Sequence, residues 1–433
     1  MKSDNVNPVQ SIQSTSTWKH GLLGEFITLQ RGFDLPSQRR QPGLFPIVSS
    51  SGISDHNSMA MVNPPGVVTG RYGTIGEVFF LQEPFWPLNT TLWVKDFKGN
   101  DERFVFYLLR TIDFNSCSDK SSVPGVNRND LHRIRISIPS CITEQRAIAR
   151  VLGALDDKIE LNRRLNRSLE ELAQAVFRSW FVDFDPVTAK ASGRTPFGLD
   201  SPTAALFPTE FQDSEVGEIP SGWLQTNLGE ETTLLMGYAF KSKFFTEAPP
   251  GVRLARGDNV KEGEFYWDNK ARYWPSVTSE LERYRLQRGD VLIGMDGSKV
   301  GKNWVRVRES DLPCLLVQRV ARLRVKNSVG EHFITRLIGN PRFRDYVEGV
   351  KTGTSIPHIS GGQIENYAFV RPARNDNRLF GRFEEIVDPW IRHADQNHDE
   401  SRSLAAARDI LLPPLLSGEL RIKDAEKLLE KSL

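Results

Sequence analysis

Residues 142–182 read ITEQRAIARVLGALDDKIELNRRLNRSLEELAQAVFRSWFV, and this stretch decides the fold. Its apolar residues recur at steps of three and four, with arginine and glutamate between them. This spacing puts them on one face of an α-helix and is typical of a coiled-coil seam. About 40 helical residues, rising about 1.5 Å each, predict a rod of roughly 60 Å. The predicted seam residues are Ile148, Leu152, Leu155, Ile159, Leu169 and Leu172.

A second stripe of the same kind follows near the end of the chain, and we expect its helix to end at Pro413-Pro414. One long helix alone would expose a large apolar patch, so we expect the two helices to pack on each other. The seam residues predicted in the second helix are Phe383, Val387, Trp390, Leu404 and Leu411.

The chain also repeats itself ahead of each stripe. The block that begins Leu23-Gly24-Glu25 returns as Leu228-Gly229-Glu230, at an offset of 228 − 23 = 205 residues. Several blocks in the same order, with a steadily growing offset, indicate an internal duplication. The other matching blocks are 67–74 with 291–298 and 123–126 with 356–359.

Short runs of β-branched and aromatic residues, separated by glycine, predict mostly strand with some helix in each copy. The expected fold class is therefore α+β, with two mixed, β-rich domains separated by two long antiparallel coiled-coil helices in a pseudo-twofold internal repeat. The expected division is a first domain over 1–141, a first helix over 142–182, an irregular connector over 183–222, a second domain over 223–374, and a second helix with a C-terminal tail over 375–433.

Composition excludes several classes of protein. The 433 residues contain 56 Lys and Arg against 54 Asp and Glu, so the formal charge of +2 is not that of a polycation. No stretch is long and apolar enough to span a membrane, and residues 1–20 are polar, so we expect a cytoplasmic protein without membrane contact. Three widely separated cysteines predict neither a metal nor a redox site.

Catalytic motifs are incomplete. The segment Gly294–Lys302 resembles a phosphate-binding loop, but Asp296 stands where a glycine is required and Asn303 replaces the residue that holds magnesium. Asn63-Pro64-Pro65 lacks the aromatic residue of a base-flipping methyltransferase loop. We therefore predict no catalytic, cofactor-binding or metal-binding site in this chain.

Basic, aromatic and small polar residues interleave in both copies, as in surfaces that contact phosphates and base edges. The predicted DNA-binding candidates are Arg31, Arg71, Tyr72, Thr74, Lys120, Ser121 and Ser122 in the first copy, and Lys241, Lys243, Arg256, Ser298, Lys299, Lys302, Arg319, Lys351, Thr352 and Thr354 in the second.

From Trp18 to about Leu429 the chain resembles the specificity (S) subunits of type I restriction–modification enzymes. No one motif is decisive, but their order is specific. The residues that carry the resemblance are the two blocks beginning Leu23 and Gly70, the segment Val123–Pro139, Glu144–Ala149 with Leu155–Ile159, Trp180–Pro186, Gly217–Trp223 and Leu415–Leu420. The second copy departs from the first at Glu144-Gln145-Arg146, which implies unequal partner contacts.

The resemblance implies a non-catalytic subunit with two target recognition domains, each reading one half of a split double-stranded DNA target, and with two long spacer helices that set their separation. It also implies two modification (methyltransferase) subunits and restriction (translocase and nuclease) subunits as partners. Those partners would bind S-adenosylmethionine, ATP and magnesium. Because the copies differ at most polar loop positions, we predict an asymmetric target.

Two other functions compete with this interpretation. One is a non-catalytic scaffold whose two modules bind peptides or glycans, and the other is a self-contained DNA methyltransferase or nuclease. Salt-sensitive, sequence-selective duplex binding together with a methyltransferase partner distinguishes the specificity subunit from both.

Overall fold

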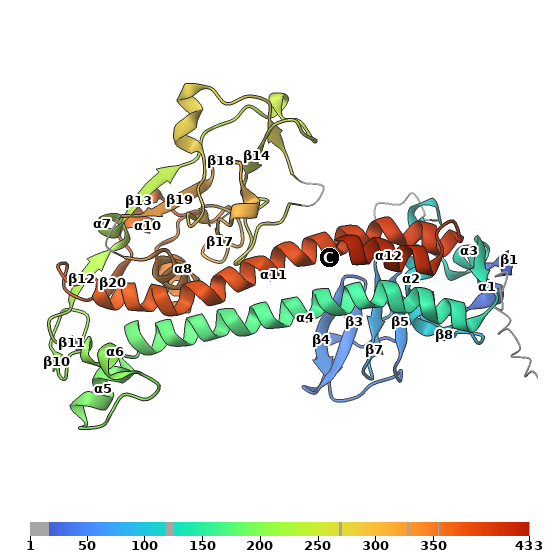
Figure 1. Cartoon of the computed structure of the whole chain (residues 1–433), viewed down its shortest axis with the longest axis horizontal. Coiled ribbons are helices and arrows are strands. Elements are labelled where there is room, and N and C mark those ends of the chain that lie inside the picture. The colour runs from blue at the N-terminus through green and yellow to red at the C-terminus, as the bar shows by residue number, and fades with distance from the viewer. Residues whose placement is uncertain (1–16, 118–124, 268–270, 327–328, 354, 433) are drawn as a thin grey trace, which may run out of the picture. The chain divides into compact units, whose positions relative to one another are not determined.

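The computed structural model describes residues 17–117, 125–267, 271–326, 329–353 and 355–432 (Figure 1). The chain divides into two compact units, Met1–Leu161 with Glu400–Leu433, and Asn162–Asp399. Each unit takes its sheets from one copy of the repeat and its helical part from both long helices. The compact units therefore cut across the division that the sequence predicts along the chain.

The first unit contains two sheets and a two-stranded ribbon. The four-stranded sheet is antiparallel throughout, in the order β2-β8-β5-β6. Its strands are Thr28–Arg31, Thr91–Asp96, Gly66–Gly70 and Val78–Leu81; the second sheet is β4-β3-β7 (Gly52–Asn57, Phe45–Ser49, Trp86–Pro87), and the ribbon is β1-β9 (Trp18–Leu22, Arg135–Pro139). The helices of this copy are α1 (Leu23–Phe26), α2 (Glu102–Arg110) and α3 (Arg128–His132), with α12 (Ile422–Ser432) from the end of the chain.

The second unit repeats this topology. Its four-stranded sheet is β13-β19-β16-β17 (Thr232–Met236, Val320–Val325, Val291–Gly294, Trp304–Arg306), its smaller sheet is β15-β14-β18 (Tyr273–Trp274, Val252–Ala255, Cys314–Leu316), and its ribbon is β12-β20 (Leu224–Asn227, Ala368–Arg371). Its helices are α7 (Leu228–Glu231), α8 (Glu331–Gly339), α9 (Pro341–Val350) and α10 (Gly361–Glu365). The matching strand order confirms the internal duplication.

Two glycines show why the repeated blocks keep their sequence. A Cβ atom at Gly32 would lie 2.2 Å from the Leu88 carbonyl oxygen, and one at Gly237 would lie 2.0 Å from that of Val317. Real side chains do not fit at such distances, so the chain crosses its neighbour closely at the same point of each copy.

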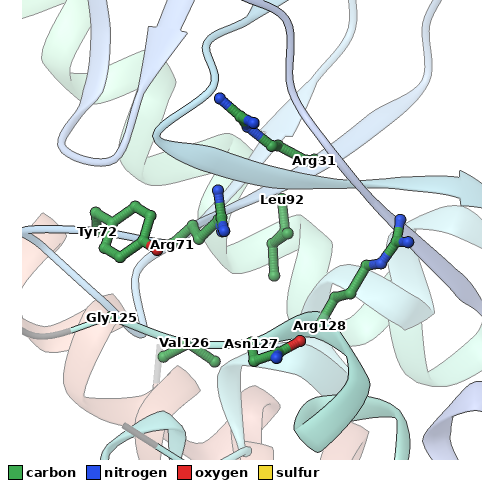
Figure 2. Close-up of a pocket in the computed structure, with 8 residues that line it drawn as sticks. All are labelled: Arg31, Arg71, Tyr72, Leu92, Gly125, Val126, Asn127 and Arg128. Carbon is green, nitrogen blue, oxygen red and sulfur yellow. The ribbon is translucent and has the colours of Figure 1, made fainter. Parts of the chain in front are cut away.

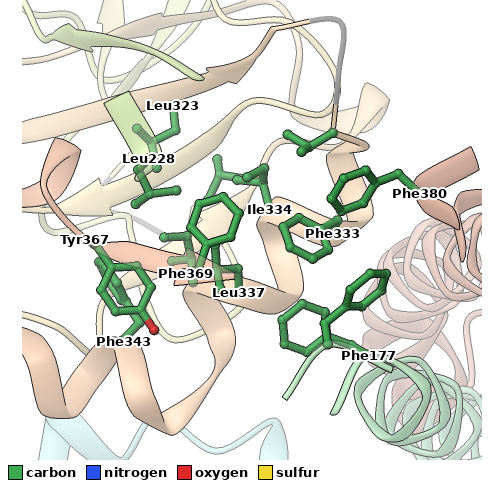
Figure 3. Packing of buried hydrophobic residues seen from close by; sticks show 14 of the residues in the cluster. Phe177, Leu228, Leu323, Phe333, Ile334, Leu337, Phe343, Tyr367, Phe369 and Phe380 are labelled. Carbon is green, nitrogen blue, oxygen red and sulfur yellow. The ribbon is translucent and has the colours of Figure 1, made fainter. Parts of the chain in front are cut away.

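The two long helices are α4 (Ile142–Phe181) and α11 (Arg378–Ser417), and they run antiparallel within each unit. In the first unit their apolar residues share one core, and Arg408 forms an ion pair with Asp156 at 2.6 Å. In the second unit, Phe177 of α4, Phe380 of α11 and Phe333 of α8 meet in one aromatic cluster (Figure 3). The long helices therefore belong to the hydrophobic core of each unit.

The predicted seam is wrong at Leu172, whose side chain is 50% exposed, and Leu169 and Trp390 are only half-buried. The other predicted seam residues are buried. The buried stripe instead runs from Asn162 to Ala173, because the helical period of 3.6 residues turns Leu172 away from the buried face.

Asparagines of both long helices also lie in the seam. Asn166 donates its Nδ2 hydrogen to the Ala394 carbonyl oxygen at 3.0 Å, and Asn397 donates to Asn166 Oδ1 at 2.9 Å. These bonds satisfy polar groups that would otherwise be buried at a cost.

The predicted end of the second helix at Pro413-Pro414 is also wrong, because α11 continues to Ser417. Proline in a helix interior removes a donor and costs about 3 kcal/mol. Here Leu415 and Leu416 are buried in the core of the first unit, which offsets that cost. The helix ends at Gly418, whose φ of +81° is the left-handed conformation typical of helix C-termini.

Gln145 belongs to the Glu144-Gln145-Arg146 block, which the second copy lacks, and it has a structural role in the first copy. Its buried carboxamide accepts the Asp101 N–H at 3.0 Å and donates to the Pro139 carbonyl oxygen at 3.0 Å, where β9 leads into α4. In the second copy the equivalent Pro372 carbonyl accepts from Arg371 Nε at 3.0 Å. The two copies thus satisfy the same carbonyl with different side chains.

The connector is more ordered than the sequence predicts. It contains α5 (Asp185–Ala191), α6 (Ser201–Ala205) and the strand pair β10 (Phe211–Gln212) and β11 (Ile219–Pro220). Val187, Phe207 and Ile219 are buried in the core of the second unit. Across the described part of the chain, no helix has the length and apolar character needed to cross a membrane.

Two leucines of α4 test the seam with a matched pair of substitutions. Leu155 is 3% exposed and Leu161 is 58% exposed. We expect Leu155→Glu to destabilise the first unit by about 3 kcal/mol or more, because it buries a carboxylate without a partner, and Leu161→Glu to change stability by less than about 0.5 kcal/mol. Urea unfolding followed by tryptophan fluorescence measures both, and equal shifts would contradict the assignment of the seam.

Candidate nucleic-acid interface

Three arginines of the first unit surround one cavity of about 420 Å³. Arg31 is the last residue of β2, Arg71 directly follows β5, and Arg128 opens α3. Figure 2 shows their side chains around a single hollow. The remaining lining residues are Tyr72, Leu92, Gly125, Val126 and Asn127.

Backbone hydrogen bonds hold the loops that carry these side chains. The Arg71 N–H donates to the Thr90 carbonyl oxygen at 2.8 Å, and the Val126 N–H donates to the Arg71 carbonyl oxygen at 2.9 Å. Gly70 is required at the turn, because a Cβ atom there would lie 1.8 Å from the Thr74 carbonyl oxygen. The loop that contains Arg71 is therefore fixed to two other segments.

Helix α3 is fixed to β2 by His132, whose Nε2 accepts the Leu29 N–H at 2.9 Å. Burial, and then the positive charge of Arg128, lowers the pKa of His132. A neutral ring can accept this hydrogen bond. Because Asn127 Oδ1 also accepts the Asn129 N–H at 2.9 Å and caps α3, the position of Arg128 relative to Arg31 is defined.

The cavity is positively charged. Arg31 forms one exposed ion pair with Asp34 at 3.3 Å, and exposed pairs of this kind hold a side chain only weakly. The Arg71 guanidinium lies 4.5 Å from the centre of the Tyr72 ring. Among the described residues, neither Arg71 nor Arg128 forms an ion pair with a carboxylate. Three guanidinium groups in a concave site suit an anion such as a phosphate.

The second unit has the same backbone frame with different side chains. The Met295 N–H donates to the Arg319 carbonyl oxygen at 2.9 Å, and the Ile359 N–H donates to the Met295 carbonyl oxygen at 2.9 Å. Met295 therefore occupies the place of Arg71, and Arg319 that of Thr90. Met295 is buried, so this place carries no guanidinium in the second unit.

Around Met295, the charged and polar side chains belong to other residues of the second unit. Arg319 Nε lies 3.6 Å from Asp296 Oδ2, and Thr352 Oγ1 lies 3.0 Å from His358 Nε2. Arg319 is exposed and has φ of +69°, a left-handed conformation that non-glycine residues rarely adopt. Strained residues of this kind cluster at functional sites.

Most of the other predicted residues lie on exposed loops, and the structure does not gather them into one site. Thr74, Lys241, Ser298, Lys299 and Lys302 are exposed. Lys243 lies 4.9 Å from the centre of the Phe244 ring. Two others form local ion pairs, Arg256 with Asp258 at 2.5 Å and Lys351 with Glu348 at 2.5 Å. Lys120, Ser121, Ser122 and Thr354 lie outside the described residues.

The predicted candidates do not include Asn127 and Arg128, which line the cavity, or Asp296 and His358, which contact Arg319 and Thr352. Their place in the sequence could have indicated them. Asn127 and Arg128 directly follow the repeated block 123–126, and His358 lies inside the matching block 356–359. Repeated glycine and proline positions mark the loops, and the polar residues beside them are the candidates for contact.

One cluster contains the residue types of a metal site. Glu331, His332 and Asp388 bring potential ligand atoms within 4.8 Å of one another. Arg288 Nη2 lies 3.2 Å from Glu331 and 3.5 Å from Asp388, and Arg392 Nε lies 2.5 Å from Asp388, so two guanidinium groups already pair with the two carboxylates. Glu384 accepts the Phe333 N–H at 2.9 Å at the start of α8. We interpret the cluster as an ion-pair network that joins α8 to α11.

Comparison with known proteins identifies one family. Residues 15–171 match the family model described as the type I restriction modification DNA specificity domain. The EcoAI specificity subunit of Escherichia coli is 32% identical over 174 residues, which are 39% of this chain and 29% of that protein. The MjaVIII specificity subunit of Methanocaldococcus jannaschii is 22% identical over 444 residues, covering 98% of this chain and 97% of that protein.

A solved structure supports the fold. The crystal structure of the type I restriction–modification S subunit from M. genitalium aligns with 94% of this chain and 97% of its own, with a TM-score of 0.56 and 16% sequence identity. At 16% sequence identity, the alignment shows a similarity of fold alone.

Arg319 provides a test of backbone strain. We expect Arg319→Gly to stabilise the chain by about 1 kcal/mol relative to Arg319→Ala, because only glycine adopts the left-handed conformation freely. Thermal unfolding of the two variants isolates the backbone effect, since both lack the guanidinium. Equal midpoints would mean that Arg319 is not strained.

The largely buried carboxyl group of Glu384 should make the stability of the folded chain depend on pH. Burial raises its pKa to about 7 from an ordinary value of 4.5, so the folded chain holds a proton that the unfolded chain releases above pH 4.5. Its contribution to stability is therefore present below pH 4.5 and is lost as the pH rises to about 7. We expect Glu384→Gln to gain stability relative to the wild type across this interval in urea unfolding. A difference that does not change with pH would contradict the assignment.

Proposed function

We propose that this chain is a member of the type I restriction–modification specificity-subunit family and a DNA sequence-recognition subunit, and that its two units read the two different halves of a split target. The proposal rests on one observation. The two copies share the same backbone hydrogen bonds at this loop but carry different side chains there. Arg71 and Met295 make the same backbone hydrogen bonds, yet one offers a guanidinium to the surface and the other a buried thioether. A shared frame with different chemistry suits the recognition of two unlike sequences.

In the first unit, we assign the cavity of Arg31, Arg71 and Arg128 to a phosphate of the DNA backbone. Guanidinium groups bind phosphate through charge-assisted hydrogen bonds, and a concave site suits a projecting phosphate better than a flat base edge. Exposed side chains near the rim, such as Tyr72 and Thr74, are then placed to reach bases.

In the second unit, Asp296 and Arg319 offer an acceptor and a donor beside Met295, the counterpart of Arg71. A carboxylate accepts from the amino group of cytosine, and a guanidinium donates to guanine. The second half of the target therefore meets a different pattern of donors and acceptors from the first.

The proposed partners follow from the family. We propose that the chain itself is non-catalytic and that it positions two modification subunits on the target, with restriction subunits in the complete enzyme. S-adenosylmethionine, ATP and magnesium would be bound by those subunits. The long helices α4 and α11, which enter both hydrophobic cores, would set the distance between the two halves of the target.

Mapping of methylated adenines in cells that express this chain with its modification subunit tests the proposal. We expect one split motif with two unlike halves and a fixed spacer. A perfect palindrome, or one uninterrupted motif, would contradict the assignment of one half to each unit.

A matched pair of arginines tests the phosphate assignment. We expect Arg71→Met, which installs the residue found in the second copy, to weaken duplex binding about tenfold at every sequence and to reduce the slope of log K against log salt by about 1. Arg135→Met, at an exposed position of β9, should leave both unchanged. Relaxed preference at a single base position, with an unchanged salt slope, would mean that Arg71 reads a base.

A further inference from the structure

Arg322 is a buried arginine of the second unit that lacks a partner. It lies within β19, and only 6% of the residue is exposed. Its Nε atom is buried without a hydrogen-bond partner, and within the described residues its guanidinium forms no ion pair. A buried charge without a partner is costly, because it loses its hydration and gains no compensating interaction. Arg322 therefore destabilises the folded chain unless a ligand pairs with it.

The carboxylate that interacts with Arg322 is already paired with another arginine. Arg324, two residues further along β19, donates to Asp290 from Nε at 2.6 Å and from Nη2 at 2.7 Å. Asp290 Oδ2 also accepts the Gln287 N–H at 2.8 Å. Burial, and then the positive charge of Arg324, lowers the pKa of Arg322. Asp290 thus compensates Arg324, and the charge of Arg322 stays unpaired.

A second arginine adds to this positive charge. Arg283 is exposed at the end of the 3-10 helix Ser279–Tyr284, and its guanidinium lies 5.3 Å from the centre of the Tyr284 ring. Its charge also lowers the pKa of Arg322, so the two groups interact. In the described part of the chain, Arg283 has no carboxylate partner either. Two such guanidinium groups suit an anion with several oxygen atoms, such as a phosphate.

Arg322 lies on the face of the four-stranded sheet that is turned away from the long helices. It pairs in register with Leu292 of β16, whose cluster joins this sheet to the smaller sheet of β14 and β18 (Figure 1). The adjacent Ala321 and Leu323 belong instead to the core that contains α8. Because β19 begins directly after Arg319, Arg322 lies about 10 Å along the strand from the surface assigned to the second half of the target.

The first unit carries no charge at the matching place. Trp93 pairs with Val68 of β5 as Arg322 pairs with Leu292 of β16, so Trp93 is its counterpart. The Trp93 ring lies 6.2 Å from the Phe33 ring and packs against an apolar cluster. The fold therefore accepts an apolar side chain at this position, and the arginine is a property of the second unit.

The opposite exchange occurs at the loop that follows β5. Arg71 lies there in the first unit, and the buried Met295 takes its place in the second. Each unit thus has an arginine where the other has an apolar residue, but on different strands of the sheet. Duplex DNA presents phosphates along its whole length, so two units on one duplex can contact its backbone through non-equivalent residues.

We propose that Arg322, with Arg283 beside it, is a phosphate-binding site of the second unit, and that duplex DNA supplies the phosphate. This inference rests on the proposed function, under which the second unit lies on DNA. It places the phosphate contacts of the two units at different positions of their sheets. The contacts to the DNA backbone then do not follow the internal repeat.

Duplex binding by the chain assembled with its modification subunit, measured over a range of salt concentrations, tests the proposal. We expect Arg322→Met to weaken binding about tenfold at every sequence and to reduce the slope of log K against log salt by about 1. Arg322→Lys keeps the charge and should keep the slope. Arg322→Met should also raise the thermal midpoint of the chain, because it removes a buried charge without a partner. A purely structural arginine would give a lower midpoint and an unchanged slope.

Arg306 provides the matched control. It is also 6% exposed and lies on β17 of the same sheet, but its Nη2 donates to Asp395 Oδ1 at 2.6 Å. Arg306→Met should lower the thermal midpoint, because it removes a partner of a largely buried carboxylate, and should leave the salt slope unchanged. Equal changes of the salt slope in the two variants would contradict the proposal.

The remaining outcomes separate this site from the proposed function. If the assembled wild type binds its target and Arg322→Met binds it with the same affinity and slope, the phosphate contact is wrong while the proposed function stands. The contact with DNA is also wrong if inorganic phosphate, compared with chloride at equal ionic strength, raises the midpoint of the wild type alone while duplex binding is the same in both. If the assembled wild type shows no sequence-selective duplex binding, the proposed function fails, and the inference fails with it.

Discussion

Two helices of 40 residues each must bury an apolar stripe along their whole length, and the rest of the structure depends on this constraint. Neither helix can do so alone, since a single exposed stripe would be a large apolar patch. Each helix therefore contributes to both cores, where its residues pack against the other long helix and against one globular copy. The sheets of each copy are attached to the helices through these cores, so the helix pair is the common scaffold of the recognition surfaces.

On that scaffold the duplication has kept the backbone and changed the surface. The close approaches at Gly32 and Gly237 and the bonds of Arg71 and Met295 are the same in both copies. What differs is the set of groups that reach solvent, guanidiniums in one unit and an Asp296–Arg319 pair in the other. This separation of frame from surface permits a change of target without a change of fold.

Periodicity and repetition made the helices and the duplication predictable, because both depend on local residue spacing. The errors arise where tertiary packing decides. Leu172 is exposed because the helical period carries the stripe to Ala173, and Pro413-Pro414 does not end α11 because Leu415 and Leu416 are buried beyond it. In the arginine-lined cavity, Arg31 and Arg71 are candidates from residue type, but Arg128 joins them only through the packing of α3 on β2. The network of Glu331, His332 and Asp388 is invisible in the sequence because its members come from two helices far apart in the chain.

The central claim is that two independent recognition surfaces share one scaffold, and a loop exchange tests it most directly. The measurement is the map of adenine methylation by a variant in which residues 71–74 (RYGT) are replaced by the matching residues 295–298 (MDGS), assembled with the modification subunit. The account predicts that one half of the split target changes while the other half and the spacer stay as in the wild type. A change in both halves, or in the spacer, would contradict it.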